Sequence, residues 1–499
     1  MKTSVATLMN ESGVAFGTSG ARGLVTAMSD RVCYAYAKAF LQHLFVTRQF
    51  SGGAVAIGAD LRPSSDRIAR ACGLGIEHVG ASANQYRVIN FAKISSPALA
   101  LFGLENNLPT IMITGSHIPD DRNGIKFTTP FGEITKADEK AIKDQIVEIP
   151  EQLFSADGSI ATQYTLPVAT DQAHGAYRKR YLDFFGADFL AGCRVGVYQH
   201  SAVLRDELVA IFKSLGATVT ALGRSEVFVP VDTEAIRSED RALAKEWASL
   251  GSYDAIVSVD GDSDRPLISD ERGGWLRGDV AGILCARYLG AQAVVTPVSS
   301  NTALEKSCYF KEIRRTRIGS PFVIEVMKEL LSTVQGPVVG YEANGGFLLA
   351  SEISRKGKQL RALPTRDALI VQLAILGLAR QEKKTISQLL AELPARYTFS
   401  ERIKDFPTEA SQQLLEKLNP ADKRRAIQAI EELFGSFAGK PESIDTTDGL
   451  RVTFTSSEVI HLRPSGNAPE LRCYSEADTL VRAEQINSQA LVKVKSLIS

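Results

Sequence analysis

The chain has 499 residues, of which 44% are hydrophobic and 23% are charged, proportions that are ordinary for a soluble globular protein. Its 57 Lys and Arg residues balance its 57 Asp and Glu residues, so the overall charge gives no support for a nucleic-acid or membrane-surface partner. At about 100–200 residues per domain, this length predicts three or four domains.

Cysteine spacing and hydrophobicity set the expected compartment. The six cysteines are far apart and none forms a CxxC pair, so we expect free thiols in a reducing compartment rather than a zinc site. The N-terminal sequence lacks the apolar core of a signal peptide, and no stretch approaches the ~20 apolar residues of a membrane span. We therefore expect a cytoplasmic protein with no membrane partner.

In the first half of the chain, short apolar runs alternate with helical patterns. Ser201 and Gly216 are typical of the first and last positions of a helix, and this helix lies between two apolar runs. A strand–helix–strand unit implies parallel pairing of its strands. In chain order, the expected elements are a strand at 54–59, a helix at 64–79, strands at 109–114 and 194–198, a helix at 201–216 and a strand at 217–223.

The same alternation continues to about residue 390, with no fixed-period sequence repeat. Each apolar strand here runs into a polar loop rich in Gly or Ser. Because ligands of such sheets bind outside the carboxyl ends of the strands, chemistry is expected in these loops. The expected elements are strands at 253–259, 292–298 and 337–341 and helices at 279–290, 300–307, 320–334 and 365–380.

The last hundred residues have a different pattern. The runs 449–455, 458–462 and 470–475 follow one another closely, as the strands of an antiparallel sheet do. A helix over 478–497 is expected to follow the last strand.

The most informative loop follows the strand at 253–259. Asp260, Asp262 and Asp264 are two residues apart, and in extended backbone their side chains would point the same way. Three converging carboxylates repel one another unless a hard divalent cation with oxygen ligands binds them. The spacing resembles the start of an EF-hand loop, but that loop's later Gly and Glu are missing. A solvated acidic turn is the alternative.

A second loop follows the strand at 109–114. Gly115 would let the backbone turn sharply and expose Ser116 at the tip of the turn. A serine nucleophile needs a neighbouring base, cation or metal, and a phosphorylated serine needs cations; His117 and Lys126 are candidates for these partners. A plain Ser/Gly turn with a hydrogen-bonded histidine is the alternative.

Three further loops carry weaker signals. Residues 16–24 surround Arg22 with small residues, as a phosphate-binding turn would, although a flexible entry loop fits equally well. Residues 340–347 place Glu342 and Asn344 two apart, a combination of acceptor and amide that suits sugar hydroxyls; a glycine-rich turn is the simpler interpretation.

The last of these loops spans residues 461–474. Arg463, Ser465, the backbone amides of Gly466 and Asn467, and Arg472 could surround a phosphate, because guanidinium groups match phosphate oxygens bidentately. A Pro-Gly hairpin with a surface arginine is the alternative.

Taken together, the five loops resemble those of the α-D-phosphohexomutase superfamily, which contains phosphomannomutases and phosphoglucomutases. They occur in that family's order over nearly the whole chain, from residue 16 to 477. TGSHIPDDRNGIKF resembles its phosphoserine loop and DGDSDR its metal loop. YEANGG is similar to its sugar-recognition loop, and RPSGNAPELR to its phosphate-binding loop.

The resemblance implies three related mixed-sheet α/β domains and a C-terminal α+β domain around a central cleft. Polar stretches near 155–170, 272–278 and 391–405 are candidate boundaries. The expected domains, which carry the phosphoserine, metal, sugar and phosphate loops in that order, are 1–160, 161–275, 276–392 and 393–499.

The resemblance also implies roles for the residues named above. Ser116 would carry the phosphoryl group and, with Asp260, Asp262 and Asp264, bind Mg2+. The residues implied to line the reacting end are Arg22, His117, Lys126 and Arg265. Glu342 and Asn344 would bind sugar hydroxyls. The phosphate that is not reacting would be held by Arg463, Ser465, Gly466, Asn467 and Arg472.

The implied activity is interconversion of hexose 6-phosphate and hexose 1-phosphate through a phosphoserine and a hexose bisphosphate. We expect a phosphomannomutase, ahead of a phosphoglucomutase or a glucosamine- or acetylglucosamine-phosphate mutase. A metal-dependent sugar phosphatase and an inactive sugar-phosphate-binding protein are the alternatives from other classes. The oligomeric state is not indicated.

Some family features are absent, and they bear on the choice of sugar. Asn344-Gly345-Gly346 stands where relatives often have Ser-Gly-His, and Asn467-Ala468 where they usually have Thr-Glu. In addition, Ser320 follows Gly319, where a His or Asp is common.

Overall fold

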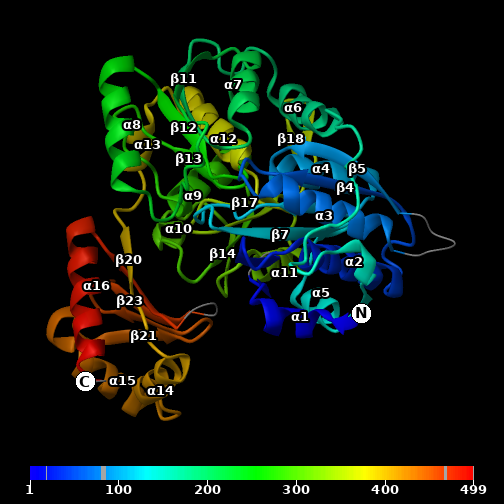
Figure 1. Ribbon diagram of the computed structural model, residues 1–499. Helices are drawn as coiled ribbons and strands as arrows, with labels where there is room; N and C mark the ends of the chain where they lie inside the picture. The colour runs from blue at the N-terminus through cyan, green and yellow to red at the C-terminus, as the bar shows by residue number, and fades with distance from the viewer. Residues whose placement is uncertain (18–19, 80–85, 466–468, 498–499) are drawn as a thin grey trace.

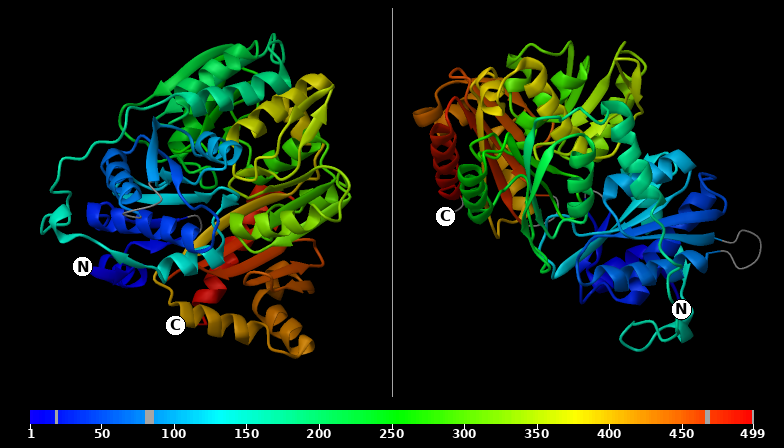
Figure 2. Two further views of the ribbon diagram at one scale, coloured as in Figure 1. Left: turned by 90° about the vertical axis from the view of Figure 1, so that its right-hand side faces the viewer. Right: turned by 90° about the horizontal axis from the view of Figure 1, so that it is seen from above.

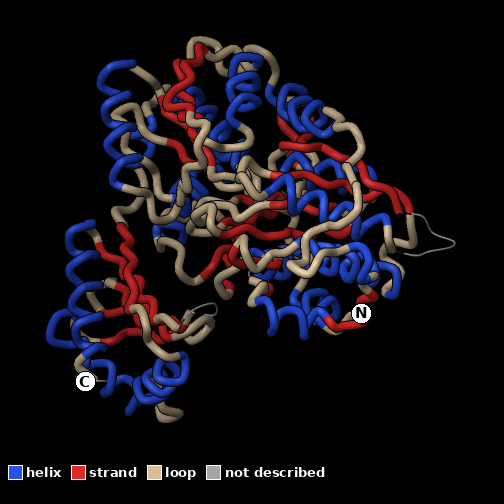
Figure 3. The backbone as a smooth tube through the Cα atoms, viewed as in Figure 1, coloured by secondary structure: helices blue, strands red, loops and turns tan. Residues whose placement is uncertain are grey.

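The computed structural model describes residues 1–17, 20–79, 86–465 and 469–497 (Figure 1). Four sheets of four or more strands, which we number in chain order, organise the described residues. Seen from above, the blue N-terminal part and the red C-terminal part lie on opposite sides of a green and yellow centre (Figure 2). Figure 3 shows the fourth sheet and its helices, at the lower left, set apart from the rest of the chain.

The first sheet is mixed. Its strands are β2 (Ala15–Phe16), β3 (Ala21–Leu24), β4 (Gly53–Ala59), β5 (Tyr86–Lys93), β6 (Thr110–Ile113), β7 (Arg122–Thr129) and β8 (Gly132–Glu133). They lie in the order β2-β3-β7-β6-β4-β5, with β8 paired to β7. The strands β5, β4 and β6 are parallel, and β7 returns antiparallel to β6.

Alternating side chains of this sheet build two cores. Val55 and Ile57 of β4 face helices α2 (Asp30–Val46) and α3 (Ser65–Glu77). Ala56 and Met112 face the other way, toward α4 (Ser96–Asn106), and join a core that continues into the second and third sheets. A buried strand with two apolar faces reads as a continuous apolar run, which is why 54–59 and 109–114 were recognisable.

The second and third sheets repeat the central pattern of the first. Their strands are β10 (Arg194–His200), β11 (Thr218–Arg224), β12 (Ala255–Val259) and β13 (Pro266–Ile268), then β14 (Ala293–Pro297), β15 (Glu312–Thr316), β16 (Val338–Tyr341) and β17 (Phe347–Leu349). The orders β11-β10-β12-β13 and β15-β14-β16-β17 match β5-β4-β6-β7 of the first sheet. In each set three strands are parallel and the fourth is antiparallel.

Helices cover these two sheets and share one core across them. Tyr177 and Tyr181 donate hydrogen bonds to Asp367, the residue that caps the long apolar helix α12. The helices are α6 (Gln172–Phe185), α7 (Arg205–Ser214), α8 (Ser238–Gly251), α9 (Gly278–Leu289), α10 (Ala303–Lys306), α11 (Ser320–Leu330), α12 (Ala368–Glu382) and α13 (Ile386–Ala391).

The fourth sheet is antiparallel throughout. Its strands are β20 (Tyr397–Ile403), β21 (Pro441–Asp445), β22 (Leu450–Phe454), β23 (Val459–Pro464) and β24 (Leu471–Ala477), in the order β20-β24-β23-β22-β21. Helices α14 (Thr408–Leu418), α15 (Lys423–Ala438) and α16 (Leu480–Lys495) pack on it around a separate core.

Smaller elements complete the described chain. They are α1 (Val5–Ser12), α5 (Lys136–Lys143), the 3-10 turn η1 (Glu151–Leu153), and the two-stranded sheets β1 (Lys2–Ser4) with β9 (Ile146–Glu148) and β18 (Ile353–Arg355) with β19 (Lys358–Leu360). Within the described ranges, no helix has both the length and the apolar character needed to cross a bilayer. The cysteines are free thiols, and Cys308 alone among the six is exposed.

These observations confirm the expected fold class, three mixed α/β units followed by an α+β unit. Some boundaries were wrong. The helix expected from Ser201 begins at Arg205, because 201–204 form a turn that packs against the loop of Asp260, Asp262 and Asp264. We call this loop, residues 260–265, the acidic loop. The segment 16–24, expected as a loop, includes a short hairpin of β2 and β3, so Arg22 lies on a strand paired with Gly124.

Candidate active site

Three predicted loops occupy the same place in three sheets. The loops of Ser116, Asp260 and Glu342 each connect the third parallel strand to the antiparallel strand, after β6, β12 and β16. Ser116 Oγ donates a hydrogen bond of 2.6 Å to Asp260 Oδ2, so the first two loops are in direct contact. A Cβ at Gly261 would lie 2.6 Å from the carbonyl oxygen of Ser116, so this contact requires glycine.

Ser116 is buried and has an unusual backbone. Its φ is 58°, the left-handed region that non-glycine residues rarely adopt, and its side chain is covered by the acidic loop. The expectation of an exposed serine at a tip formed by Gly115 was therefore wrong. Gly115 is needed for a different reason, because a Cβ there would lie 2.6 Å from Arg62 Cζ.

The three aspartates converge through a turn and not through extended backbone, which corrects the expectation from their spacing. The amide of Ser263 donates to the carbonyl of Asp260, and Ser263 has a φ of 63°. One oxygen from each of Asp260, Asp262 and Asp264 lies within 4.8 Å of the others, and all three side chains are buried.

The surroundings of these carboxylates fit a divalent cation. Lys126 Nζ lies 2.5 Å from Asp262 Oδ2 and 2.8 Å from Asp264 Oδ2. The Oδ1 atoms of Asp262 and Asp264 are buried and have no hydrogen-bond partner among the residues that the structure describes. Unpartnered buried carboxylate oxygens beside a serine hydroxyl are suitable oxygen ligands for a hard metal ion.

Electrostatics supports the same conclusion. Burial and the neighbouring Asp262 and Asp264 raise the pKa of Asp260 to about 8. Burial opposes ionisation of Asp264 too, but Arg366 and Lys126 outweigh it and hold its pKa below the usual value. Without a further positive charge the group would retain a proton on Asp260, and a divalent cation removes that need.

His117 is held as a neutral imidazole. Burial and the Arg265 guanidinium lower its pKa to about 3. Arg265 Nη1 lies 2.7 Å from His117 Nδ1, which must therefore accept, leaving the ring proton on Nε2. Asp232, which the sequence did not suggest, lies on the Nε2 side at 4.0 Å, and Ser116 Oγ is 3.4 Å from Nδ1.

Several guanidinium groups gather beside these residues. Burial, together with repulsion from Arg265 and Arg366, lowers the pKa of Arg22 to about 10. Such crowding of like charges is typical of a site for a polyanion such as a phosphoryl group.

Arg366 is a site residue that sequence reasoning missed. Its Nε lies 3.0 Å from Asp264 Oδ2, and its Nη1 lies 3.5 Å from Glu342 Oε2, so it links the acidic loop to the loop of the third sheet. The sequence predicted a helix over 365–380, but α12 begins at Ala368 and leaves Arg366 in the preceding loop. The polar TRD before an apolar helix was the available signal.

The loop after β16, which carries Glu342 and Asn344, is a tight turn. Asn344 Oδ1 accepts the amide of Gly346, and its carbonyl accepts the hydroxyl of Thr233 from the second unit. Glu342 and Asn344 are both buried close to Arg366 and Gly346. The structure therefore brings these two residues to the same region as the acidic loop.

Arg463 and Arg472 are farther along the chain, on β23 and β24. Arg463 Nε donates to Asp448 Oδ2 at 2.8 Å, and Arg472 Nε is buried without a hydrogen-bond partner in the described part of the chain. Ser465 follows β23 and is buried. Gly466 and Asn467 lie outside the described residues.

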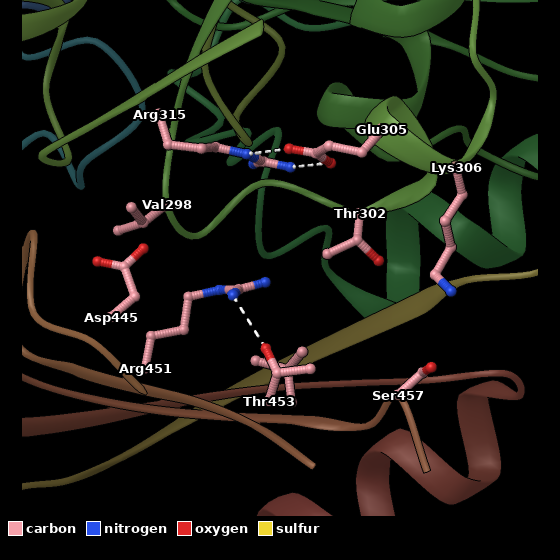
Figure 4. A pocket seen from close by; sticks show the side chains of 10 residues that line it. Val298, Thr302, Glu305, Lys306, Arg315, Asp445, Arg451, Thr453 and Ser457 are labelled. Atoms are coloured by element: carbon pink, nitrogen blue, oxygen red, sulfur yellow. Dashed lines mark hydrogen bonds and ion pairs between the residues drawn. The ribbon is translucent and has the colours of Figure 1, made fainter. Parts of the chain in front are cut away.

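A separate pocket of about 250 Å³ lies between the third and fourth sheets (Figure 4). Arg315 and Glu305 form an ion pair along one wall, and Arg451 donates to Thr453 on the opposite wall. None of the predicted site residues lines this pocket, so it is distinct from the converging loops.

Comparisons with known proteins identify the family of this chain. Family models described as phosphoglucomutase/phosphomannomutase domain I, domain III and C-terminal domain match residues 13–153, 277–397 and 415–491. The chain is 44% identical to a phosphomannomutase of Salmonella muenchen, covering 98% of this chain and 97% of the relative. It is 42% identical to a phosphomannomutase of Sinorhizobium fredii, covering 97% and 99%.

Two solved structures share the fold. A phosphoglucomutase/phosphomannomutase family protein from Burkholderia thailandensis superimposes with a TM-score of 0.72 at 18% identity, covering 96% of this chain and 97% of that one. An Aspergillus fumigatus N-acetylphosphoglucosamine mutase, solved with GlcNAc-6P and magnesium, gives 0.59 at 14% identity, with 99% of each chain covered.

Proposed function

Because the chain belongs to the phosphoglucomutase/phosphomannomutase family, we propose that it is an isomerase that interconverts hexose 6-phosphate and hexose 1-phosphate through phospho-Ser116 and a hexose bisphosphate. The observation that carries this proposal is the 2.6 Å contact between Ser116 Oγ and Asp260 Oδ2, with Arg22 and Arg265 close by. Mannose phosphate is the preferred substrate class, since the 44% and 42% identical relatives are phosphomannomutases.

Charge neutralisation is the main task of this site. Ser116 with Asp260, Asp262 and Asp264 would hold Mg2+, which when bound supplies positive charge beside the transferring phosphoryl group. The Lys126 ammonium and the guanidinium groups around Ser116 add to it.

The transfer itself exchanges one P–O bond for another. The bond between phosphorus and Ser116 Oγ breaks as a bond to the free sugar hydroxyl forms, and that hydroxyl loses its proton. Ser116 Oγ takes up a proton as it leaves, which balances the proton that the sugar hydroxyl loses, and the Lys126 ammonium stabilises charge. His117, whose Nδ1 accepts from Arg265 and whose pKa is lowered to about 3, would stay neutral beside Ser116. The reverse transfer, from the other end of the bisphosphate, regenerates phospho-Ser116.

Two phosphate positions are needed, because the bisphosphate must turn end for end between the two transfers. Arg463, Arg472 and Ser465, with Gly466 and Asn467, would hold the phosphate that is not reacting. Glu342 and Asn344 would hold sugar hydroxyls between the two positions. Closure around the sugar would exclude water, whose attack would hydrolyse the phosphoserine.

The four sheets support a proposed division into domains 1–160, 161–275, 276–392 and 393–499, one sheet in each. A cytoplasmic location is proposed with it, on the basis of the sequence alone.

A coupled assay with mannose, glucose, glucosamine and acetylglucosamine phosphates, with Mg2+ and a hexose 1,6-bisphosphate activator, tests the proposal. We expect isomerisation, fastest with mannose phosphate, and an intact mass showing one phosphoryl group. Stoichiometric release of inorganic phosphate would identify a phosphatase instead. Binding of hexose phosphate with no turnover of any kind would identify an inactive binding protein.

A further inference from the structure

Arg62 is the largest side chain that the structure buries completely, counted over the described residues, with 1% of its surface exposed. It lies in the turn between β4 and α3, in none of the predicted site loops. A buried guanidinium must have its hydrogen bonds satisfied, since an unpaired charge in the interior is very costly. The partners of Arg62 therefore indicate its role.

All five N–H groups of this guanidinium donate hydrogen bonds, and four of them go to backbone carbonyls of a single loop. That loop, 116–122, begins with the serine proposed as the phosphoryl carrier. The bonds are Nε to Asp60 Oδ2 at 3.1 Å, Nη1 to the carbonyls of Pro119 at 2.8 Å and Arg122 at 3.1 Å, and Nη2 to those of Ser116 at 2.9 Å and Ile118 at 2.6 Å.

Arg62 and Asp60 together fix the backbone on both sides of Ser116, the residue with left-handed φ. Arg62 binds the carbonyl of Ser116, and Thr114 Oγ1 accepts the amide of Ser116 at 2.8 Å. Thr114 Oγ1 in turn donates to Asp60 Oδ2 at 2.7 Å. A left-handed non-glycine residue costs about 1–2 kcal/mol and persists only where its surroundings fix it. Asp60 and Arg62 supply that fixation from both sides.

The guanidinium is also packed against the neighbouring unit. Its Cζ lies 4.1 Å from the ring centre of Phe228, which follows β11 in the second unit. A Cβ at Gly261 would meet the same ring at 3.4 Å, so Phe228 lies between Arg62 and the acidic loop. Arg62 thus bonds the loop of Ser116 directly and reaches the loop of Asp260 only through Phe228.

We propose that Arg62, fixed by Asp60, is a positioning residue for phosphoryl transfer, which directs the Ser116 hydroxyl at the acidic loop without touching substrate. This inference rests on the proposed function. A lysine in its place has three donors and no planar fork, so it can satisfy only part of the loop. Because a misplacement of about 1 Å can cost about 100-fold in rate, Arg62→Lys should lower kcat by about that factor.

Arg315 provides a matched control. It too is a largely buried arginine that binds several backbone carbonyls, those of Pro297, Ser300 and Asn301, and an ion-pair partner, Glu305. Its loop carries none of the proposed site residues. Arg315→Lys should therefore destabilise the fold to a similar degree and leave kcat within about threefold of wild type.

The experiment compares Arg62→Lys, Arg315→Lys and wild type in kcat, KM and hydrogen exchange of the 114–122 amides. We expect about a 100-fold loss of kcat with little change in KM, and faster exchange confined to this loop, only in Arg62→Lys. Wild-type kcat in Arg62→Lys, or unchanged exchange in the loop, would overturn the proposal.

A second variant covers a failure to fold. Thr114→Val keeps Arg62 and removes both Oγ1 hydrogen bonds, and it should shift kcat and loop exchange in the same direction by a smaller factor. If Thr114→Val changes neither kcat nor loop exchange, the positioning role proposed for Arg62 and Asp60 is refuted. Hydrogen exchange is measured without substrate and therefore tests whether Arg62 fixes the loop, whatever the activity. A wild-type protein inactive on every hexose phosphate would count against the proposed function only.

Discussion

Arg463 and Arg472 face each other directly in the register of β23 and β24, so two guanidinium groups share one face of the fourth sheet. Like charges at directly opposed positions destabilise an antiparallel pair. Asp448 compensates only in part, because it binds Arg463 Nε and leaves Arg472 Nε without a hydrogen bond within the described ranges. In the proposed function, a phosphate would complete this pair as an anion site.

Arg463→Ala should raise KM for the hexose phosphate by about 10- to 100-fold, since a charge-assisted bond contributes about 1.5–3 kcal/mol. Steady-state kinetics with the preferred sugar measures this change. Arg451→Ala removes an arginine of the same sheet that lines the separate pocket, and should leave KM unchanged. An unaltered KM in Arg463→Ala would remove the second phosphate position from the mechanism.

Ser116→Ala should abolish isomerisation and phosphorylation together, because among the described residues only the Ser116 hydroxyl bonds the Asp260 carboxylate. Intact mass after incubation with a hexose bisphosphate should show no added phosphoryl group, and circular dichroism should be unchanged. Ser249→Ala, on the exposed face of α8, is the matched control and should remain active. Residual turnover well above background in Ser116→Ala would assign the phosphoryl carrier elsewhere.

Asp262→Asn should weaken Mg2+ binding and activity in parallel, by about tenfold or more, because it removes one of the converging carboxylates. Calorimetric titration with the metal alone gives the affinity without depending on turnover. Asp183→Asn, in an exposed pair with Lys179, should leave both quantities unchanged. Loss of activity with intact metal affinity would show that Asp262 has another role.

Arg366→Gln should destabilise the fold by about 3–5 kcal/mol, since it leaves the buried carboxylates of Asp264 and Glu342 without their shared cation. Denaturant unfolding measures the difference. Arg178→Gln breaks the more exposed pair with Glu207 and should cost less than about 1 kcal/mol. Equal stabilities of the two variants would contradict the bridging role assigned to Arg366.

The contribution of two buried histidines to stability should fall as the pH is lowered from about 6.5 to 4. Burial lowers the pKa of both His200 and His461 to about 4, whereas a histidine in the unfolded chain titrates near 6.5. Between these values the unfolded state binds more protons, so each neutral histidine loses up to about 3 kcal/mol of its contribution as the pH falls. The contribution is complete above pH 6.5.

Unfolding free energies at several pH values in this window test the prediction. His461→Gln, which keeps a donor for the carbonyl of Asp448 but cannot titrate, should reduce the slope. A slope identical to that of wild type would show that His461 does not titrate in this range.

The loops of Ser116, Asp260 and Glu342 could be located from the sequence because each follows a buried apolar strand, whose end marks the edge of the sheet. Asp260 and Ser116 both satisfied that local rule. Their contact was predicted from the family resemblance and not from the spacing, and the turn that joins Asp260 to Asp264 is set by local hydrogen bonds that spacing cannot show.

Other features depend on contacts distant in sequence. Arg366 is 102 residues from Asp264, and its local signal, the polar TRD before an apolar helix, does not show which residues it meets. Arg62 lies in an ordinary-looking turn, and only the folded chain shows that its donors meet a loop more than 50 residues later. Ser116 was expected to be exposed because the acidic loop that covers it belongs to another sheet.

The repeated strand order has a consequence for how this chain can change. The same strand arrangement occurs three times and places a loop at the same corner each time, and these loops carry Ser116, the three aspartates and Glu342. Because the buried strands set the corner and the loop sets the chemistry, each loop can be altered without rebuilding its sheet. If Glu342 and Asn344 hold sugar hydroxyls as proposed, transplanting the 341–347 turn between relatives should change sugar preference.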